Sequence, residues 1–207
     1  MKTQKCSALF FTAAFAVSLL LSGCASDAPP VSNTPPAEDA AQSGGETDTG
    51  TASKLGVLKS FTADTLDGGV FTQDDIMNRD VTVINFWSTT CGPCIAEMPD
   101  LAAFAEALPD NVAVITVCLD GARVPDTAKE LLNKAGFEGI TLITGSEDLI
   151  DVCRNIQYTP TTVFVDNEGN LAGDAIIGGQ KDLSETFLKA INSVLNAEGK
   201  EEISLEE

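Results

Sequence analysis

The sequence predicts an α/β domain with a central mixed β-sheet and helices on both of its faces. Apolar, β-branched runs at 81–87 and 112–119 are continuous rather than alternating, as in strands that are covered on both sides. Segments with apolar residues at helical spacing, such as 94–108 and 181–195, follow these runs. Strands and helices that alternate along a chain pack as layers around one core.

The remaining elements are marked by turn residues and helix caps. In chain order, we predict a hairpin of 61–66 and 70–71 around Asp67-Gly68-Gly69, a short helix that Thr72 caps and that ends at Met77, a helix from Pro125 to Ala135, a strand at 140–143, a helix that Ser146 caps and that ends near Asn155, and a hairpin of 161–165 and 171–177. These elements complete one layered domain.

Composition divides the chain into four parts. Residues 1–23 have lysines before an apolar run that is short of the about 20 residues of a membrane span, so they are predicted to be a signal peptide. Residues 24–54 are rich in Pro, Ala, Ser, Thr and Gly and are expected to form a disordered linker. Residues 55–197 suffice for one domain, and 198–207 are expected to be a frayed acidic tail.

The end of the signal peptide has a cysteine directly after small residues. Leu21-Ser22-Gly23-Cys24 resembles the bacterial lipobox, in which the peptide is cut before the cysteine and lipid is attached to it. This resemblance implies that Cys24 anchors an extracytoplasmic protein to the bacterial cell membrane. An ordinary secretory signal that is cleaved nearby is the alternative.

The chain is strongly acidic, with 31 acidic and 12 basic residues and a formal net charge of −19. This charge makes nucleic acid and anionic lipid headgroups poor partners. Its plain effect is solubility, and steering toward basic partners remains an open alternative.

A pair of cysteines stands where the pattern changes from strand to helix. Cys91-Gly92-Pro93-Cys94 follows the buried run that ends in Trp87. Two intervening residues let the sulfurs close a disulfide across a helical turn, whose free amides and dipole stabilise a thiolate. We expect Cys91 to attack and Cys94 to resolve the mixed disulfide. Gly92 and Pro93 are expected to tune the potential, and Trp87 to pack beneath the site.

Zinc binding and a purely structural disulfide are the alternatives to a redox role. A zinc site needs two further thiol or imidazole ligands, but the chain has no histidine, and Cys24, Cys118 and Cys153 form no second close pair. The strand–loop–helix context argues against a merely structural bond. We therefore expect no metal, and no cofactor other than the redox-active disulfide.

Two stretches are similar to one known family. Residues 85–87, the two cysteines with Gly-Pro between them, and 97–99 resemble the thioredoxin superfamily and, within it, the membrane-anchored TlpA/ResA-like thiol-disulfide oxidoreductases. Residues 158–166 are the second matching stretch. The resemblance implies a thioredoxin-like fold, in which Pro160 is cis and faces the dithiol while Thr159 offers its backbone to a substrate strand. A trans proline that begins a strand is the alternative.

The resemblance also bears on two polar residues. Thioredoxin has a buried aspartate at the position of Asn85, whose amide cannot ionise. Similar TlpA/ResA-like proteins have a glutamate with a redox role at the position of Glu97, one helical turn after Cys94. Such a carboxyl can pass protons to or from the inner thiol. A solvated helix carboxylate is the alternative for Glu97.

Reduction of protein disulfides is the function that the resemblance implies, and we expect a monomer. Thioredoxin also has Gly-Pro between its cysteines and a potential of about −270 mV, whereas DsbA-like oxidants, near about −120 mV, have a histidine there. An oxidising exterior implies recharging by a CcdA/DsbD-type transmembrane electron donor, with cytochrome c maturation among the implied processes. A non-enzymatic lipid-anchored binding module is one alternative. A thiol peroxidase of related fold is another, although Ile84 stands where its motif requires proline.

Two further cysteines are not required by any thioredoxin motif. Cys118 ends a predicted strand and Cys153 lies in the helix that leads to Pro160, so both are expected near the edge with the dithiol. A disulfide between them would close a loop of roughly 35 residues and add about 3–4 kcal/mol of stability. Two buried free thiols are the interpretation that we favour over this bond, because the sequence does not reveal where either side chain points.

Overall fold

Residues 55–205 are described by the structure, a computed structural model. The predicted signal peptide, the predicted linker with the expected lipidation site Cys24, and residues 206–207 lie outside the described residues. Within 55–205, no helix combines the length and the apolar composition that a membrane span requires.

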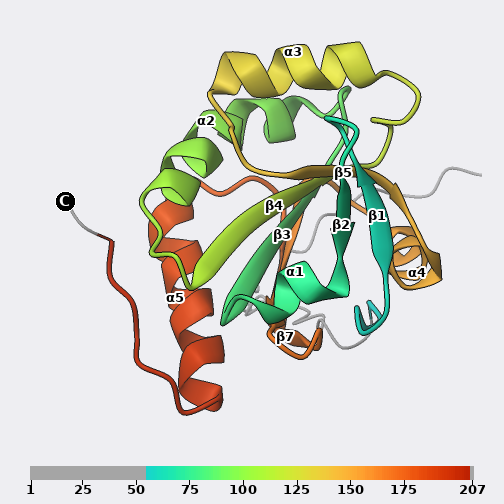
Figure 1. Cartoon of the computed structure of the whole chain (residues 1–207). Coiled ribbons are helices and arrows are strands. Elements are labelled where there is room, and N and C mark those ends of the chain that lie inside the picture. The colour runs from blue at the N-terminus through green and yellow to red at the C-terminus, as the bar shows by residue number, and fades with distance from the viewer. Residues whose placement is uncertain (1–54, 206–207) are drawn as a thin grey trace, which may run out of the picture. The chain divides into compact units, whose positions relative to one another are not determined.

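One mixed sheet forms the centre of the described part (Figure 1). Its strands are β1 (Thr62–Thr65), β2 (Val70–Thr72), β3 (Val81–Trp87), β4 (Val112–Cys118), β5 (Thr141–Gly145), β6 (Thr161–Asp166) and β7 (Leu171–Ile177). Their order across the sheet is β2-β1-β5-β4-β3-β6-β7. β3, β4 and β5 run parallel, whereas β6 is antiparallel to β3 and β1 is antiparallel to β5.

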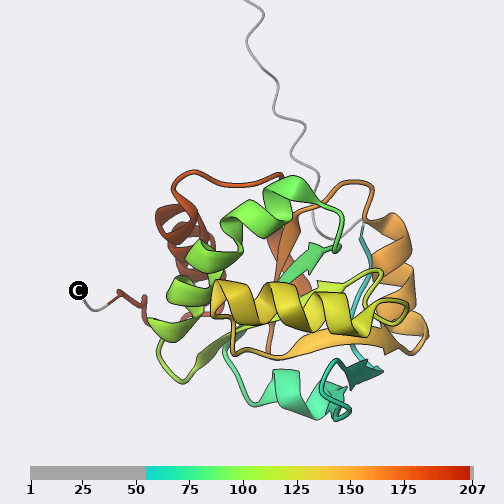
Figure 2. The same cartoon turned by 90° about the horizontal axis from the view of Figure 1, so that it is seen from above.

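Helices cover both faces of this sheet (Figure 2). They are α1 (Gln73–Met77), α2 (Gly92–Glu106), α3 (Pro125–Ala135), α4 (Glu147–Asn155) and α5 (Leu183–Ala197). One hydrophobic core lies between the sheet and α2, α3 and α5, and a second lies between the sheet and α1 and α4. The predicted fold class is therefore confirmed.

β3 contributes to both cores because successive side chains of a strand point to opposite faces. Val81, Val83 and Trp87 are buried under α2, α3 and α5. Ile84 and Phe86 are buried in the core under α1 and α4. This arrangement explains why the run at 81–87 is continuously apolar, apart from a threonine and an asparagine.

The ends of several strands meet at one edge of the sheet. Trp87 at the end of β3 pairs with Cys118 at the end of β4. Phe86 pairs with Thr161 at the start of β6, and Thr161 pairs with Ile177 at the end of β7. The loops that follow β3, β4 and β7 and the loop that precedes β6 therefore leave from the same edge, where α2 also begins.

Side-chain contacts fix the N-termini of α1 and α2, but not that of α4. The backbone N–H of Thr72 donates to Asp75 Oδ2 at 2.7 Å, which closes the N-terminus of α1. α2 begins at Gly92 rather than at Cys94 as predicted, because Cys91 caps it. Ser146 precedes α4 as predicted, but its hydroxyl accepts a hydrogen bond from the backbone N–H of Thr62 at 3.1 Å instead of capping the helix.

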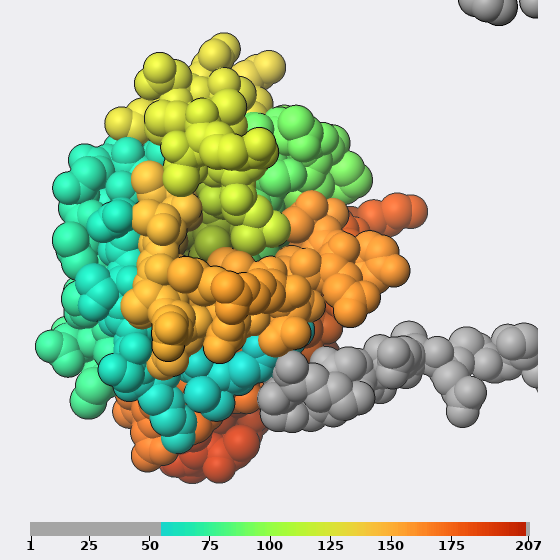
Figure 3. Space-filling view, turned by 90° about the vertical axis from the view of Figure 1, so that its right-hand side faces the viewer, coloured from blue at the N-terminus to red at the C-terminus, as the bar shows by residue number. Residues whose placement is uncertain are grey.

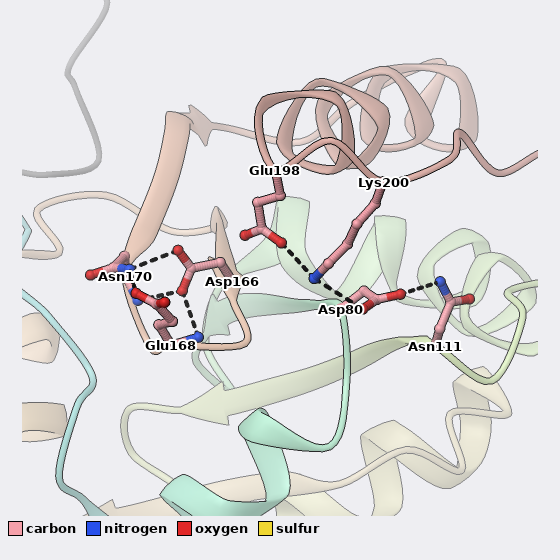
Figure 4. Close-up of polar contacts among 7 residues, drawn as sticks. All are labelled: Asp80, Asn111, Asp166, Glu168, Asn170, Glu198 and Lys200. Atoms are coloured by element: carbon pink, nitrogen blue, oxygen red, sulfur yellow. Dashed lines mark hydrogen bonds and ion pairs between the residues drawn. The ribbon is translucent and has the colours of Figure 1, made fainter.

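Residues 198–205 of the predicted acidic tail are docked on the domain, so the expectation that the tail frays is wrong for this part of it. The side chain of Asn192 on α5 makes two hydrogen bonds with the backbone of Ile203, each of 2.9 Å. Lys200 Nζ lies 3.0 Å from Asp80 and 2.5 Å from Glu198 (Figure 4). Ile203 also packs against the core under α5. The polar contacts come from one amide and one ammonium group, and the acidic composition of the segment does not reveal them.

Replacing Lys200 by alanine is expected to lower the free energy of unfolding by about 0.5–1 kcal/mol, because one ammonium group joins two carboxylates. Hydrogen bonds from Asn111 and Lys200 lower the pKa of Asp80 (Figure 4). A carboxyl with a lowered pKa stabilises the fold at higher pH and loses this effect as the pH falls through its folded pKa. The loss in the variant should therefore shrink in acid.

Urea titrations of wild type and Lys200→Ala at about pH 7 and about pH 3 measure this difference. Lys134→Ala, an exposed lysine on α3, is the control. Equal losses for both lysine variants at neutral pH would show that the tail contributes nothing through Lys200.

Candidate active site

The two cysteines lie at the N-terminus of α2, directly after the loop that follows β3. Cys91 is the N-cap, and its Sγ accepts a hydrogen bond from the backbone N–H of Cys94 at 3.2 Å. A disulfide joins the two sulfurs, with 5.3 Å between the Cα atoms. Cys91 is half-buried, whereas Cys94 is fully buried. A sulfur at a helix N-terminus that receives an N–H donor is stabilised as a thiolate, so this geometry favours a thiolate on Cys91 when the bond is reduced.

The loop between β3 and α2 is tied to the loop that follows β4. The backbone N–H of Cys91 donates to the carbonyl of Ser88 at 3.1 Å, which closes a turn. Thr89 donates its backbone N–H and its hydroxyl to the carboxylate of Asp120, at 2.9 and 2.6 Å. Burial opposes the charge of Asp120, but the hydrogen bonds from Thr89, Cys118 and the backbone of Asp120 together lower the pKa of this carboxyl. Asp120 is therefore ionised at neutral pH and holds the loop that leads to Cys91.

Gly92, Pro93 and Trp87 occupy the places that the motif predicts. Gly92 and Pro93 are exposed in the first turn of α2, where proline is tolerated because the first N–H groups of a helix have no helical acceptor. Trp87 is fully buried in the same core cluster as Cys94. Its indole N–H has no hydrogen-bond partner among residues 55–205, so within this part of the chain Trp87 contributes by packing.

Thr159 and Pro160 lie at the same edge of the sheet as the dithiol. The peptide bond between them is cis. Pro160 is buried, and its carbonyl accepts a hydrogen bond from the backbone N–H of Gly178 at 2.8 Å. The next residue, Thr161, pairs with Phe86 near the end of β3. The loop before β6 and the loop after β7 are therefore joined beside the strand that leads to the cysteines.

Glu97 is buried, so the alternative of a solvated helix carboxylate is wrong. The residue is 6% exposed. The amide of Asn85 donates to its Oε1 at 3.3 Å, and the backbone N–H of Gln180 donates to its Oε2 at 3.1 Å. Burial raises the pKa of Glu97, and these two hydrogen bonds oppose the rise only in part. A carboxyl one turn beyond Cys94 therefore titrates at a higher pH than an ordinary glutamate.

Asn85 reaches Glu97 because of its position in the strand. Side chains of a strand alternate between its two faces, so Asn85 points to the same face as Val83 and Trp87. This is the face that α2 covers. Its Nδ2 also donates to Thr162 Oγ1 at 3.0 Å, and Thr162 lies directly opposite on β6. One amide thus connects the hydroxyl of β6 with the carboxyl of α2.

Thr162 and Gln180 belong to this site but were missed by sequence analysis. The loop with Gln180 lies against the start of α2, because a Cβ added to Gly179 would lie 3.4 Å from Glu97 Oε2 and 3.7 Å from Pro93 Cβ. The two glycines before Gln180 were the available signal, since glycine lets backbone approach other groups closely. Nothing in the sequence connected this loop with Glu97, 83 residues earlier.

Cys118 and Cys153 are free thiols, so the disulfide that was considered between them is not formed. Cys118 shares a core with Trp87 on one face of the sheet, whereas Cys153 packs against the core on the other face. Both nevertheless line one recess at the sheet edge, as their expected positions implied. Burial raises the pKa of Cys118 to about 12 and that of Cys153 to about 11. Both thiols are therefore protonated at neutral pH and are poor nucleophiles.

No candidate metal site is present among residues 55–205. These residues form no group of three or more His, Cys, Asp or Glu side chains that could hold a metal ion. The sulfurs of Cys91 and Cys94 are bonded to each other. A pair of bonded sulfurs such as this one can take up and release two electrons.

The fold and this site together define a thioredoxin-like thiol-disulfide oxidoreductase. The chain belongs to the AhpC/TSA family, whose model matches residues 57–174. Thiol-disulfide oxidoreductase ResA of Bacillus anthracis is 27% identical over 133 residues, 64% of this chain and 75% of that protein. Thioredoxin-like protein YneN of Bacillus subtilis is 29% identical over 110 residues, 53% of this chain and 63% of that protein. A thioredoxin-family thiol:disulfide interchange protein from Chlorobium tepidum shares the fold, with a TM-score of 0.55 and 21% identity over 66% of this chain and 96% of that one.

Replacing Glu97 by glutamine is expected to slow disulfide reduction by about 10²-fold, the lower end of general acid–base effects. Because the pKa of Glu97 is raised, the pH–rate profile of the wild type should contain an ionisation above the ordinary value of about 4.3, which the variant lacks. Stopped-flow oxidation of the reduced protein by a small disulfide, from about pH 4 to about pH 9, measures both effects. Glu106→Gln, an exposed carboxyl on the same helix, is the control. Identical profiles for wild type and Glu97→Gln would leave Glu97 with a structural role only.

The difference in stability between wild type and Glu97→Gln should change with pH in the opposite direction to the difference between wild type and Lys200→Ala. A group with a raised pKa stabilises the fold at low pH and loses this effect as the pH rises through its folded pKa. Glu97→Gln should therefore gain stability relative to the wild type between about pH 4 and about pH 8 in urea titrations. A constant difference would contradict the burial of an ionisable Glu97.

Proposed function

We propose that this oxidoreductase reduces disulfides of polypeptide substrates outside the cytoplasm, while it is attached to the membrane through Cys24. The observation that supports the chemistry most directly is the half-buried Cys91 sulfur at the N-terminus of α2, with the Cys94 N–H 3.2 Å away. A second polypeptide can reach this sulfur, whereas Cys94 is fully buried. ResA, a relative named as a thiol-disulfide oxidoreductase, supports the same class of chemistry.

The reaction begins with attack of the Cys91 thiolate on one sulfur of the substrate disulfide. A bond forms between Cys91 and that sulfur, and the other substrate sulfur leaves with the electron pair and takes up a proton. Cys94, once deprotonated, attacks the Cys91 sulfur, which re-forms the Cys91–Cys94 bond and releases the second substrate thiol. The substrate gains two electrons and two protons, and the dithiol loses them.

Glu97 is the group that we assign to accept the proton of the Cys94 thiol. It lies one turn along α2 from Cys94, on the same side of the helix. Burial raises the pKa of Glu97 and so brings it closer to the pKa of an ordinary thiol. Transfer of a proton from a thiol to this carboxylate is therefore less unfavourable. Asn85 and the backbone of Gln180 keep the carboxylate in place by their hydrogen bonds.

Gly-Pro between the cysteines, and the absence of histidine from the chain, favour a reductant over an oxidant. Outside the cytoplasm such a reductant needs electrons from across the membrane, so we propose a CcdA/DsbD-type transmembrane donor. Lipid on Cys24 would keep the domain beside that donor, since each buried methylene group adds about 0.8 kcal/mol to membrane attachment.

A thiol peroxidase of related fold is the competing candidate. Its motif needs a proline where this chain has Ile84. Ile84 lies in the middle of β3, between Ile115 of β4 and Val163 of β6, where a proline would remove a hydrogen bond of the sheet. These residues favour reduction of disulfides over reduction of peroxide.

Cys91→Ser is expected to abolish insulin reduction, whereas Cys94→Ser should accumulate mixed disulfides, because attack still occurs but resolution cannot. Turbidity of precipitating insulin chains measures turnover, and non-reducing gel electrophoresis detects the trapped complexes. The double variant, which should trap nothing, controls for the other cysteines. Normal insulin reduction by Cys91→Ser would overturn the proposed function, and peroxide consumption without insulin reduction would replace it with the peroxidase.

A further inference from the structure

A recess opens where α4 and β5 meet the loop that follows β4, between the yellow-green and the orange segments in Figure 3. It has a volume of about 360 Å³. Leu119 and Ile150, which line it, are 40% and 36% exposed. The other apolar side chains of the lining are Val117, Ile143 and Leu149. The recess is therefore an apolar hollow that is open to solvent.

The size of the recess suits a single large side chain. An apolar protein cavity of about 150 Å³ binds benzene, and sites for small organic ligands start near about 300 Å³. The recess thus has room for one aromatic or branched aliphatic group. Arg154 at the lining forms an exposed ion pair with Asp151, with 2.9 Å between Nη1 and Oδ1, so a carboxylate already competes for this guanidinium. A neutral, apolar occupant is favoured over an anion.

The recess lies beside the loop that leads to the active-site cysteine. Cys118, which lines it, pairs with Trp87 at the end of β3. Asp120, the neighbour of Leu119, accepts two hydrogen bonds from Thr89, two residues before Cys91. These chain lengths place Leu119 within roughly 15 Å of Cys91. An extended polypeptide covers this span with about four or five residues, at about 3.3 Å per residue.

We propose that this recess is a substrate subsite, which receives one apolar side chain of the polypeptide whose cysteine is bonded to Cys91. The proposal rests on the proposed reduction of polypeptide disulfides. The open mouth with its exposed Leu119 and Ile150, and the position beside the Cys91 loop, assign the recess to a side chain of the substrate. Substrates with a large apolar residue at the matching distance from their cysteine therefore react fastest.

A peptide series tests this subsite with the reduced full-length protein. Each peptide has one cysteine joined to 5-thio-2-nitrobenzoate, in a chain of Gly, Ser and Ala with one phenylalanine. The phenylalanine is moved from about two to about six residues from the cysteine on either side. The Cys91 thiolate attacks the peptide sulfur, the Cys91–peptide disulfide forms, and the coloured thiolate leaves with the electron pair. Its release gives the rate, after subtraction of the rate of Cys91→Ser.

We expect a narrow window of positions on one side of the cysteine in which the phenylalanine peptide reacts about tenfold faster than its alanine counterpart, as burial of an aromatic side chain implies. Ile150→Glu, which places a charge at the mouth, should reduce this ratio to about twofold or less. Leu119→Glu, on a different element, should do the same. Ile140→Glu is the matched control, because Ile140 is 44% exposed at the opposite end of β5, and it should keep the full ratio.

Three results would overturn the subsite. Equal rates for all phenylalanine positions, or a preference that persists in both Ile150→Glu and Leu119→Glu, would overturn it while the proposed function stands. Loss of the preference in Ile140→Glu as well would also overturn it, because the effect would then be one of general charge. Absence of release from every peptide, and from a small aromatic disulfide, would instead overturn the proposed function and the subsite with it.

Discussion

The position at which α2 begins is the constraint on which the site depends. Because Cys91 caps the helix, the backbone N–H of Cys94 points to the Cys91 sulfur rather than to water. A helix that began at Cys94 itself would direct its first free N–H groups past this sulfur. The exposed Gly92 and Pro93 then occupy the first turn, where a missing or unpaired N–H has no cost to the helix. The difference in exposure between the two cysteines follows from this placement, since one stands before the helix and the other is inside its first turn.

The buried carboxyl of Glu97 connects α2, the helix that carries the dithiol, with β3 and with the loop after β7. It is held by Asn85 from β3 and by the backbone of Gln180 from the loop after β7. The same loop is bonded through Gly178 to the carbonyl of Pro160. The loop before β6, the loop after β7 and the start of α2 therefore form one hydrogen-bonded unit. A substrate strand that lies along the Pro160 loop would contact the unit that also holds the carboxyl of Glu97, one helical turn from Cys94.

Local patterns in the sequence predicted the elements and the redox motif, but not the contacts between distant segments. Continuous apolar strands, turn glycines and caps are local signals, and the helix from Pro125 to Ala135 was predicted to the residue. The burial of Glu97 depends on Gln180, which is 83 residues away and has no motif of its own. The separation of Cys118 from Cys153 depends on which face of the sheet α4 covers, and that is decided by the packing of the whole domain.

The reduction potential of the Cys91–Cys94 couple tests the central claim, that this dithiol is a reductant, most directly. It can be measured by equilibrating the protein with defined ratios of reduced and oxidised dithiothreitol or glutathione and quantifying the dithiol. We predict a value close to that of thioredoxin, about −270 mV, for a Cys-Gly-Pro-Cys motif capped in this way. A value near that of DsbA, about −120 mV, would contradict the account and make the protein an oxidant.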